Sequence, residues 1–120
     1  MRKIALSLMV LALVAGIARA QHGYELKEVP RDQVCMVNNQ FMGTEQIPIK
    51  VEGKQYYGCC EMCVEKLHGS EAVRTAIDPL SGEKIDKSSS FIVAKPDKRV
   101  LYFASEKNFI DYQKRQTKEN

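Results

Sequence analysis

Four cysteines give this 120-residue chain its most distinctive chemistry. Three residues separate Cys59 from Cys63, Cys60 and Cys63 form a Cys-x-x-Cys pair, and 23 residues separate Cys35 from Cys59. Side chains three or four residues apart at the start of a helix lie on one face, and the amide groups there favour thiolate over thiol. Thiolates select soft or borderline ions such as Cu(I) and Zn(II). The spacing therefore predicts a soft-metal site built from Cys35, Cys59 and Cys63, with Cys60 as the fourth candidate ligand.

Other side chains near the cysteines bear on the choice of metal. Met36 and Met62 flank cysteines, Met42 lies nearby, and a thioether is a ligand that Cu(I) accepts and Zn(II) seldom does. We therefore expect Cu(I) first and Zn(II) as the alternative. Core packing or plain surface exposure would explain the same methionines. His68 and His22 are further candidate ligands, with solvated surface positions as the alternative.

Disulfide chemistry is the competing explanation, because an even number of cysteines in an exported protein often indicates disulfide bonds. Cys60 and Cys63 would pair as in a thiol–disulfide exchanger, or Cys35 would pair with a cysteine of the cluster. A thioredoxin-like protein places its Cys-x-x-Cys in a βαβ pattern. This chain instead shows hairpins and short helices.

The elements around the cysteines follow from local signals. Residues 47–51 and 55–57 flank Glu52-Gly53-Lys54, which predicts a β-hairpin with Gly53 in its turn. A helix over 61–68 follows and ends at Gly69. A second helix is expected over 71–77, with Ser70 as its N-cap and the Asp-Pro pair at 78–79 as its end.

The second half of the chain is expected to repeat these elements. Residues 91–94 and 100–103 bracket a Pro-Asp-Lys turn and predict a second hairpin, and Ser105 can cap a last helix that carries Phe109, Ile110 and Tyr112. The tyrosines and phenylalanine at 56, 57, 102 and 103 are expected to pack between the two halves. The acidic residues at 78, 83 and 86 are expected to form a solvated turn.

An internal similarity relates the two halves at an offset of 45 residues, since 54–67 aligns with 99–112. The positions of Cys59, Cys60 and Cys63 are then occupied by Ala104, Ser105 and Asn108, and Ser81 falls near the position of Cys35. Similarity at a fixed offset indicates a duplicated unit. One copy would carry the metal and the other would have lost its ligands.

Residues 33–67 resemble the TRASH/YHS group of small metal-binding domains. Gly58-Cys-Cys-Glu-Met-Cys63 after a tyrosine-bearing hairpin, with Val34-Cys-Met36 upstream, carries the resemblance. It implies an α+β fold of two treble-clef-like ββα units in tandem, the second lacking cysteines. It also implies metal ligands at Cys35, Cys59 and Cys63 and a role in heavy-metal binding, sensing or trafficking, often of copper. Cys60 stands where the group often has serine or another cysteine.

The N-terminus has the pattern of a secretory signal over 1–20: a basic start, an apolar run and Ala18-Arg19-Ala20. Its apolar run is too short to span a bilayer. One metal-binding domain is then expected over 21–120, with a cysteine-bearing unit at 33–69 and a cysteine-free repeat at 78–115. Removing the three basic residues of the signal leaves 15 basic against 15 acidic residues, which argues against a nucleic-acid or anionic-membrane partner.

These observations predict a periplasmic or secreted binding protein and not an enzyme. No Ser/His/Asp set, paired-carboxylate motif or phosphate-binding loop stands out in the sequence. The expected function is to bind copper as a metallochaperone, scavenger or tolerance factor, with a metal donor or acceptor protein as a possible partner. The alternatives are a structural zinc or disulfide-stabilised interaction module and a thiol–disulfide oxidoreductase.

Overall fold

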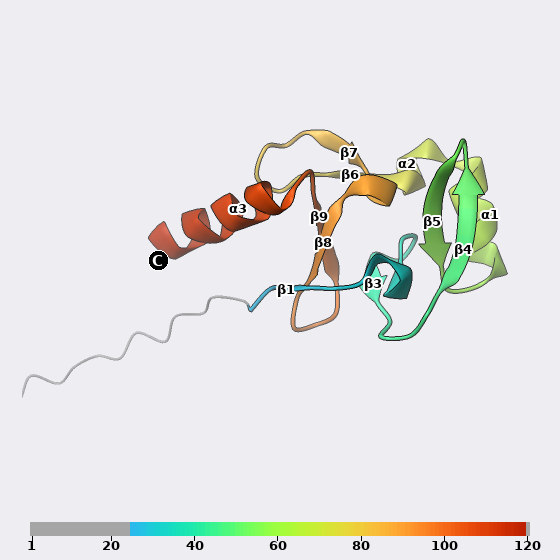
Figure 1. Cartoon of the computed structure of the whole chain (residues 1–120), viewed down its shortest axis with the longest axis horizontal. Coiled ribbons are helices and arrows are strands. Elements are labelled where there is room, and N and C mark those ends of the chain that lie inside the picture. The colour runs from blue at the N-terminus through green and yellow to red at the C-terminus, as the bar shows by residue number, and fades with distance from the viewer. Residues whose placement is uncertain (1–24, 120) are drawn as a thin grey trace, which may run out of the picture.

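The computed structural model describes residues 25–119, which form a mixed α+β fold of small antiparallel sheets and helices (Figure 1). Three strands pair in the order β1-β8-β9, namely β1 (Lys27–Glu28), β8 (Phe91–Ala94) and β9 (Val100–Phe103). The two-stranded sheets are β2 (Val34–Cys35) with β3 (Gln40–Phe41), β4 (Ile47–Val51) with β5 (Lys54–Gly58), and β6 (Thr75–Ile77) with β7 (Lys84–Asp86). The helices are α1 (Glu61–Gly69), α2 (Glu71–Arg74) and α3 (Glu106–Lys118), with 3-10 turns η1 (Arg31–Gln33) and η2 (Lys87–Ser89).

Both predicted hairpins are confirmed. In β4–β5, Ile49 lies opposite Tyr56 and both side chains are buried. The two turn residues, Glu52 and Gly53, have φ of 53° and 78°. This positive φ at both central positions suits a two-residue hairpin, because such a turn matches the twist of the strands. The β8–β9 hairpin closes around residues 95–99 as expected.

The first and last predicted helices are also confirmed. Helix α1 begins at Glu61 directly after Cys60 and runs to Gly69, one residue beyond the predicted end. Helix α3 begins after Ser105, whose hydroxyl accepts a hydrogen bond from the amide of Asn108 at 3.2 Å. This capping bond satisfies an amide that has no partner inside the helix.

The predicted helix over 71–77 is wrong in its second part. Helix α2 ends at Arg74, and residues 75–77 form β6, which pairs with β7. Thr75 and Ile77 are β-branched and suit a strand, and three residue pairs with β7 satisfy backbone groups that a helix would otherwise need. Ser70 stands at the N-cap as expected, but its side chain makes no capping hydrogen bond. Upstream of the cysteines, β1 pairs with β8 at the edge of the three-stranded sheet.

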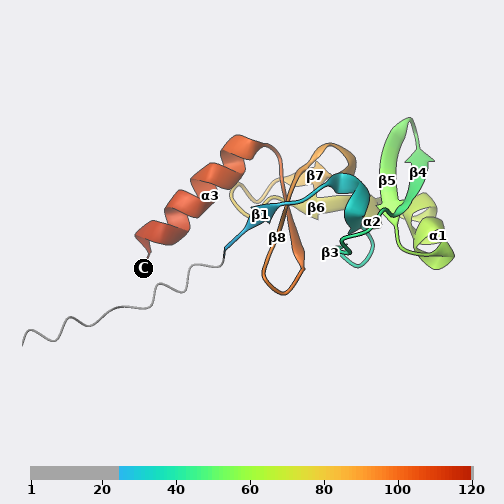
Figure 2. The same cartoon turned by 60° about the horizontal axis from the view of Figure 1, so that its bottom comes forward.

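Each half of the described chain has the same order of elements: a small hairpin, a longer hairpin and a helix. The first set is β2–β3, β4–β5 and α1; the second is β6–β7, β8–β9 and α3. Figures 1 and 2 show α1 with β4–β5 at one end of the molecule and α3 towards the other. The α+β class is confirmed, and the tandem treble-clef arrangement stays a prediction.

A single hydrophobic core joins the two halves. It includes Met36, Tyr56 and Leu67 from the first half and Ile92 and Tyr102 from the second. Phe103 is fully buried and packs against the rings of Phe109 and Tyr112 on α3. Of the aromatic residues expected between the halves, Tyr56 and Tyr102 lie in this core and Tyr57 packs against it, whereas Phe103 packs against α3 instead.

The predicted signal at 1–20 lies outside the described residues. Within residues 25–119, no helix has the length and apolar character needed to cross a bilayer.

Candidate metal centre

Three cysteine side chains converge on one point of the first half. Cys35 lies at the end of β2, Cys59 directly follows β5, and Cys63 lies in the first turn of α1. The Sγ of Cys63 is 3.9 Å from that of Cys35 and 3.5 Å from that of Cys59, and all three sulfurs lie within 4.8 Å of one another. Cys35 and Cys63 are buried and Cys59 is half-buried. In this part of the chain the structure brings together the three ligands predicted from sequence.

Short backbone contacts hold these cysteines in place. The amide of Met36 donates to the carbonyl of Tyr57 at 2.9 Å, which fixes the Cys35 loop against β5. A Cβ on Gly58 would lie 3.0 Å from the Cβ of Cys63. Glycine at this position therefore lets the start of α1 approach the end of β5 closely enough to bring the sulfurs of Cys59 and Cys63 together.

Cys60 occupies a different position from the other three. Its Sγ lies 3.6 Å from that of Cys63, but it is not part of the group whose sulfurs are all within 4.8 Å of one another. Cys60 is exposed and stands at the N-cap of α1. It is therefore adjacent to the centre on the solvent side, in contact with one ligand.

The thiol groups have unequal acidity. Burial alone would raise the pKa of Cys35, but the amides of Asn38 and Val37 outweigh it and lower this pKa below its usual value. The amide of Cys63 lowers the pKa of the Cys60 thiol. Burial raises the pKa of Cys63. The hydrogen bond with Cys63 raises the pKa of Cys59 to about 12, because Cys59 keeps the proton that the two sulfurs share. A cation in the centre would replace that shared proton.

The other candidate ligands predicted from sequence lie in different environments. Met36 is fully buried in the hydrophobic core, which supports the packing explanation. Met42 and Met62 are exposed, at 42% and 66%. His68 is in the last turn of α1 and belongs to no metal-ligand group of the described residues, and His22 lies outside them.

A buried lysine next to the Cys35 loop gave no sequence signal. Lys87 comes from η2 in the second half and is only 4% exposed. Its Nζ donates to the carbonyl of Met36 at 2.6 Å and to Oδ1 of Asn39 at 2.8 Å. Burial lowers the pKa of Lys87 to about 8, so the ammonium form prevails at neutral pH. A lysine before a run of serines ordinarily indicates a solvated turn.

The second half has a carboxylate where the first has its thiols. Asp78 is fully buried, and its Oδ1 accepts hydrogen bonds from the amides of Leu80 at 2.7 Å and Ser81 at 3.2 Å. Its Oδ2 accepts from the amide of Ala104 at 2.8 Å and from Nδ2 of Asn108 at 2.9 Å. Burial would raise the pKa of Asp78, but these donors together lower it.

This arrangement corrects the predicted alignment of the halves. Cys35 is stabilised by amides two and three residues later, and Asp78 accepts from amides at the same two spacings. Asp78 therefore takes the place of Cys35, rather than Ser81. Ala104 and Asn108, aligned with Cys59 and Cys63, are the residues that Asp78 binds.

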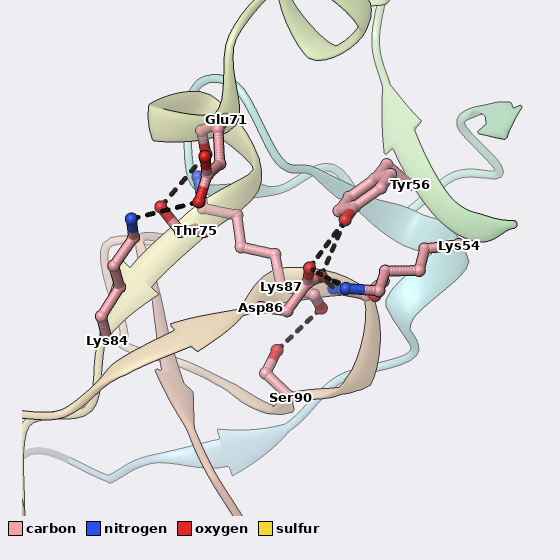
Figure 3. A network of polar contacts seen from close by, with 9 residues as sticks. Lys54, Tyr56, Glu71, Thr75, Lys84, Asp86, Lys87 and Ser90 are labelled. Atoms are coloured by element: carbon pink, nitrogen blue, oxygen red, sulfur yellow. Dashed lines mark hydrogen bonds and ion pairs between the residues drawn. The ribbon is translucent and has the colours of Figure 1, made fainter. Parts of the chain in front are cut away.

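The expected solvated turn is also wrong at Asp86, which links the halves (Figure 3). Its carboxylate accepts hydrogen bonds from Tyr56 Oη at 2.9 Å and Lys54 Nζ at 3.1 Å, both on β5. It also accepts from the amide and hydroxyl of Ser88 at 2.9 Å and 2.6 Å. Burial opposes ionisation, but these donors lower the pKa of Asp86 to about 2.

Comparison of the chain with protein-family models, curated proteins and solved structures found no match. The functional argument therefore depends on the geometry of the centre itself.

Proposed function

We propose that this protein binds one soft metal ion, Cu(I) in the first place and Zn(II) as the alternative, through Cys35, Cys59 and Cys63. The observation that carries the proposal is the convergence of three sulfurs from three separate elements within 4.8 Å. Two thiolates of a tetrahedral zinc site are ~3.8 Å apart, given a Zn–S bond of ~2.3 Å. The separations of 3.9 and 3.5 Å at Cys63 are close to that value, so an ion fits with little rearrangement.

The number of sulfurs favours Cu(I). A structural Zn(II) site almost always has four protein ligands, whereas three thiolates leave it one short. Cys60 lies outside the compact group, and no histidine joins it among the described residues. A soft, monovalent ion is well served by thiolates alone.

The exposed sulfur of Cys60 supports a role in metal transfer. It lies 3.6 Å from the ligand Cys63 and is accessible to solvent. During transfer to an acceptor protein on this side, the Cys60 sulfur can bind the ion while Cys63 is still a ligand. We propose on this basis a metallochaperone, scavenger or tolerance factor that has no catalytic activity. With the predicted signal at 1–20, it would act in the periplasm or outside the cell.

The finer description of the fold belongs to the same proposal. The repeated order of elements and the equivalence of Asp78 with Cys35 support a tandem pair of treble-clef-like units. The first unit would be stabilised by a metal ion and the second by the carboxylate of Asp78. The resemblance to TRASH/YHS domains predicts the same arrangement.

A competition titration with Cu(I) and Zn(II) probe ligands tests the proposal on the reduced protein under nitrogen. We expect one equivalent of Cu(I) to bind tightly and the Cys59→Ser, Cys63→Ser double variant to lose it. Cys60→Ser is the matched control, and it should keep the stoichiometry while slowing release to a competing chelator. Tight zinc binding with unfolding on zinc removal would instead support a structural module. Binding of neither ion would refute the proposal.

One observation favours a thiol–disulfide oxidoreductase as the second candidate. Cys60 is exposed, has a lowered pKa and lies 3.6 Å from the buried Cys63 at the start of a helix. Attacking cysteines of exchange enzymes have these properties. Catalysed reduction of insulin by the metal-free protein, lost in Cys60→Ser, would support this function; absence of turnover would exclude it.

A further inference from the structure

The side chain of Lys87 places a fixed positive charge beside the candidate metal centre. Its two acceptors, the Met36 carbonyl and Asn39 Oδ1, lie on the loop that follows Cys35. The hydroxyl of Tyr102 donates to the same Asn39 oxygen at 2.9 Å, and the Tyr102 ring lies 5.2 Å from the ammonium. Three contacts from two halves of the chain therefore hold the ammonium in one position.

Among the described residues, no carboxylate forms an ion pair with this ammonium. Both hydrogen-bond acceptors of Lys87 are uncharged oxygens, and the ion pairs found in residues 25–119 do not include Lys87. The neighbouring Asp86 directs its carboxylate to Tyr56 and Lys54 instead, and Figure 3 shows the Asp86 and Lys87 side chains leaving the chain in different directions. Burying an uncompensated lysine is costly, and this ammonium is bound to the carbonyl of Met36, the residue that directly follows the candidate ligand Cys35.

The charge of the loaded centre depends on the metal. Three thiolates with Cu(I) keep two negative charges, whereas the same thiolates with Zn(II) keep one. A fixed positive charge nearby therefore stabilises the Cu(I) form more than the Zn(II) form, because the Cu(I) form has one more negative charge. The association constants for Cu(I) and Zn(II) refer to the same metal-free protein. Their ratio therefore does not depend on which thiols are protonated before binding.

We propose that Lys87 is a specificity-determining residue that shifts the centre towards Cu(I) and away from Zn(II). The inference rests on the proposed function, because it assumes that the three cysteines hold the ion. Lys87 touches no metal in this role. It acts through its charge, held in place by Asn39 and Tyr102.

The test compares association constants for Cu(I) and Zn(II) in the wild type and in Lys87→Met at pH 7, with the protein reduced. Methionine keeps the length of the buried chain and removes the charge. One unit charge acting over ~10 Å at an effective dielectric constant of ~20 corresponds to roughly a tenfold effect. We therefore expect the Cu(I)/Zn(II) ratio to fall roughly tenfold. Lys50→Met, which removes an exposed lysine on β4, should leave the ratio unchanged.

A second variant keeps the buried contacts. Asn39→Asp retains an oxygen acceptor for both Lys87 and Tyr102 and neutralises the ammonium with a carboxylate, so the ratio should fall here too. Equal loss of both affinities, or a ratio within about twofold of wild type in both variants, would overturn the role of Lys87 while leaving the metal proposal intact. Failure of the wild type to bind either ion would overturn both.

Discussion

Replacing Asp78 by alanine removes one acceptor that serves four donors. Two of these donors, the amides of Leu80 and Ser81, lie in the adjoining turn, and their hydrogen bonds are partly buried. The other two, the amide of Ala104 and Nδ2 of Asn108, fix the end of β9 and the start of α3 and are partly buried. A hydrogen bond to a charged acceptor contributes ~1.5–3 kcal/mol, and a donor left unsatisfied in the interior adds a similar penalty.

We therefore expect Asp78→Ala to lower the free energy of unfolding by about 3–4 kcal/mol, taking as the main contribution the two hydrogen bonds that join Asp78 to residues 26 and 30 positions later in the chain. This is a large share of the ~5–15 kcal/mol typical of a domain. The assay is urea denaturation of the reduced, metal-free protein at pH 7, followed by far-ultraviolet circular dichroism. Asp97→Ala is the matched control, since Asp97 also accepts an amide in a hairpin turn but is 55% exposed. A loss below about 1 kcal/mol, or equal to that of the control, would refute the role assigned to Asp78.

Three further outcomes follow from the same structure. Asp86 has a pKa of about 2 in the folded protein, below its ordinary value. Its contribution to the free energy of unfolding is therefore present near neutral pH and is lost as the pH falls from about 5 to about 2. After allowance for solvent screening we expect Asp86 to contribute ~1–2 kcal/mol to the free energy of unfolding near neutral pH. Asp86→Asn should therefore reduce the fall of this free energy at acid pH; a fall as large as in the wild type would contradict the hydrogen-bond network around Asp86. Loading with Cu(I) at 1,000 times its Kd should stabilise the fold by ~4 kcal/mol and chelation should reverse this, whereas an unchanged melting temperature would count against a site present only in the folded protein. Asp78→Cys, Ala104→Cys and Asn108→Cys combined should create a second site, measured as a second equivalent of bound metal; a stoichiometry of one would argue against equivalent units.

Local sequence signals were sufficient for the hairpins, for α1 and α3, and for three ligands of the candidate centre. The Glu52-Gly53 turn forms because Gly53 adopts a positive φ without steric cost, and Ser105 begins a helix because its hydroxyl satisfies an amide. Cys59, just before α1, and Cys63, in the first turn of α1, come together for the same reason of short-range geometry. Each of these features depends on atoms a few residues apart, except the approach of Cys35 to Cys63, which lies 28 residues later in the chain.

Contacts between distant residues decided the rest. Residues 75–77 became a strand because β7 offers partners, and Asp78 is buried because α3 brings Asn108 to it from 30 residues away. Lys87 gained its role because packing of the two halves places it against Met36, 51 residues earlier in the chain. The sequence by itself determined which side chains could act as ligands. The tertiary structure decided which sulfurs meet and which charge stands beside them, because burial and electrostatic environment arise only when distant segments pack together.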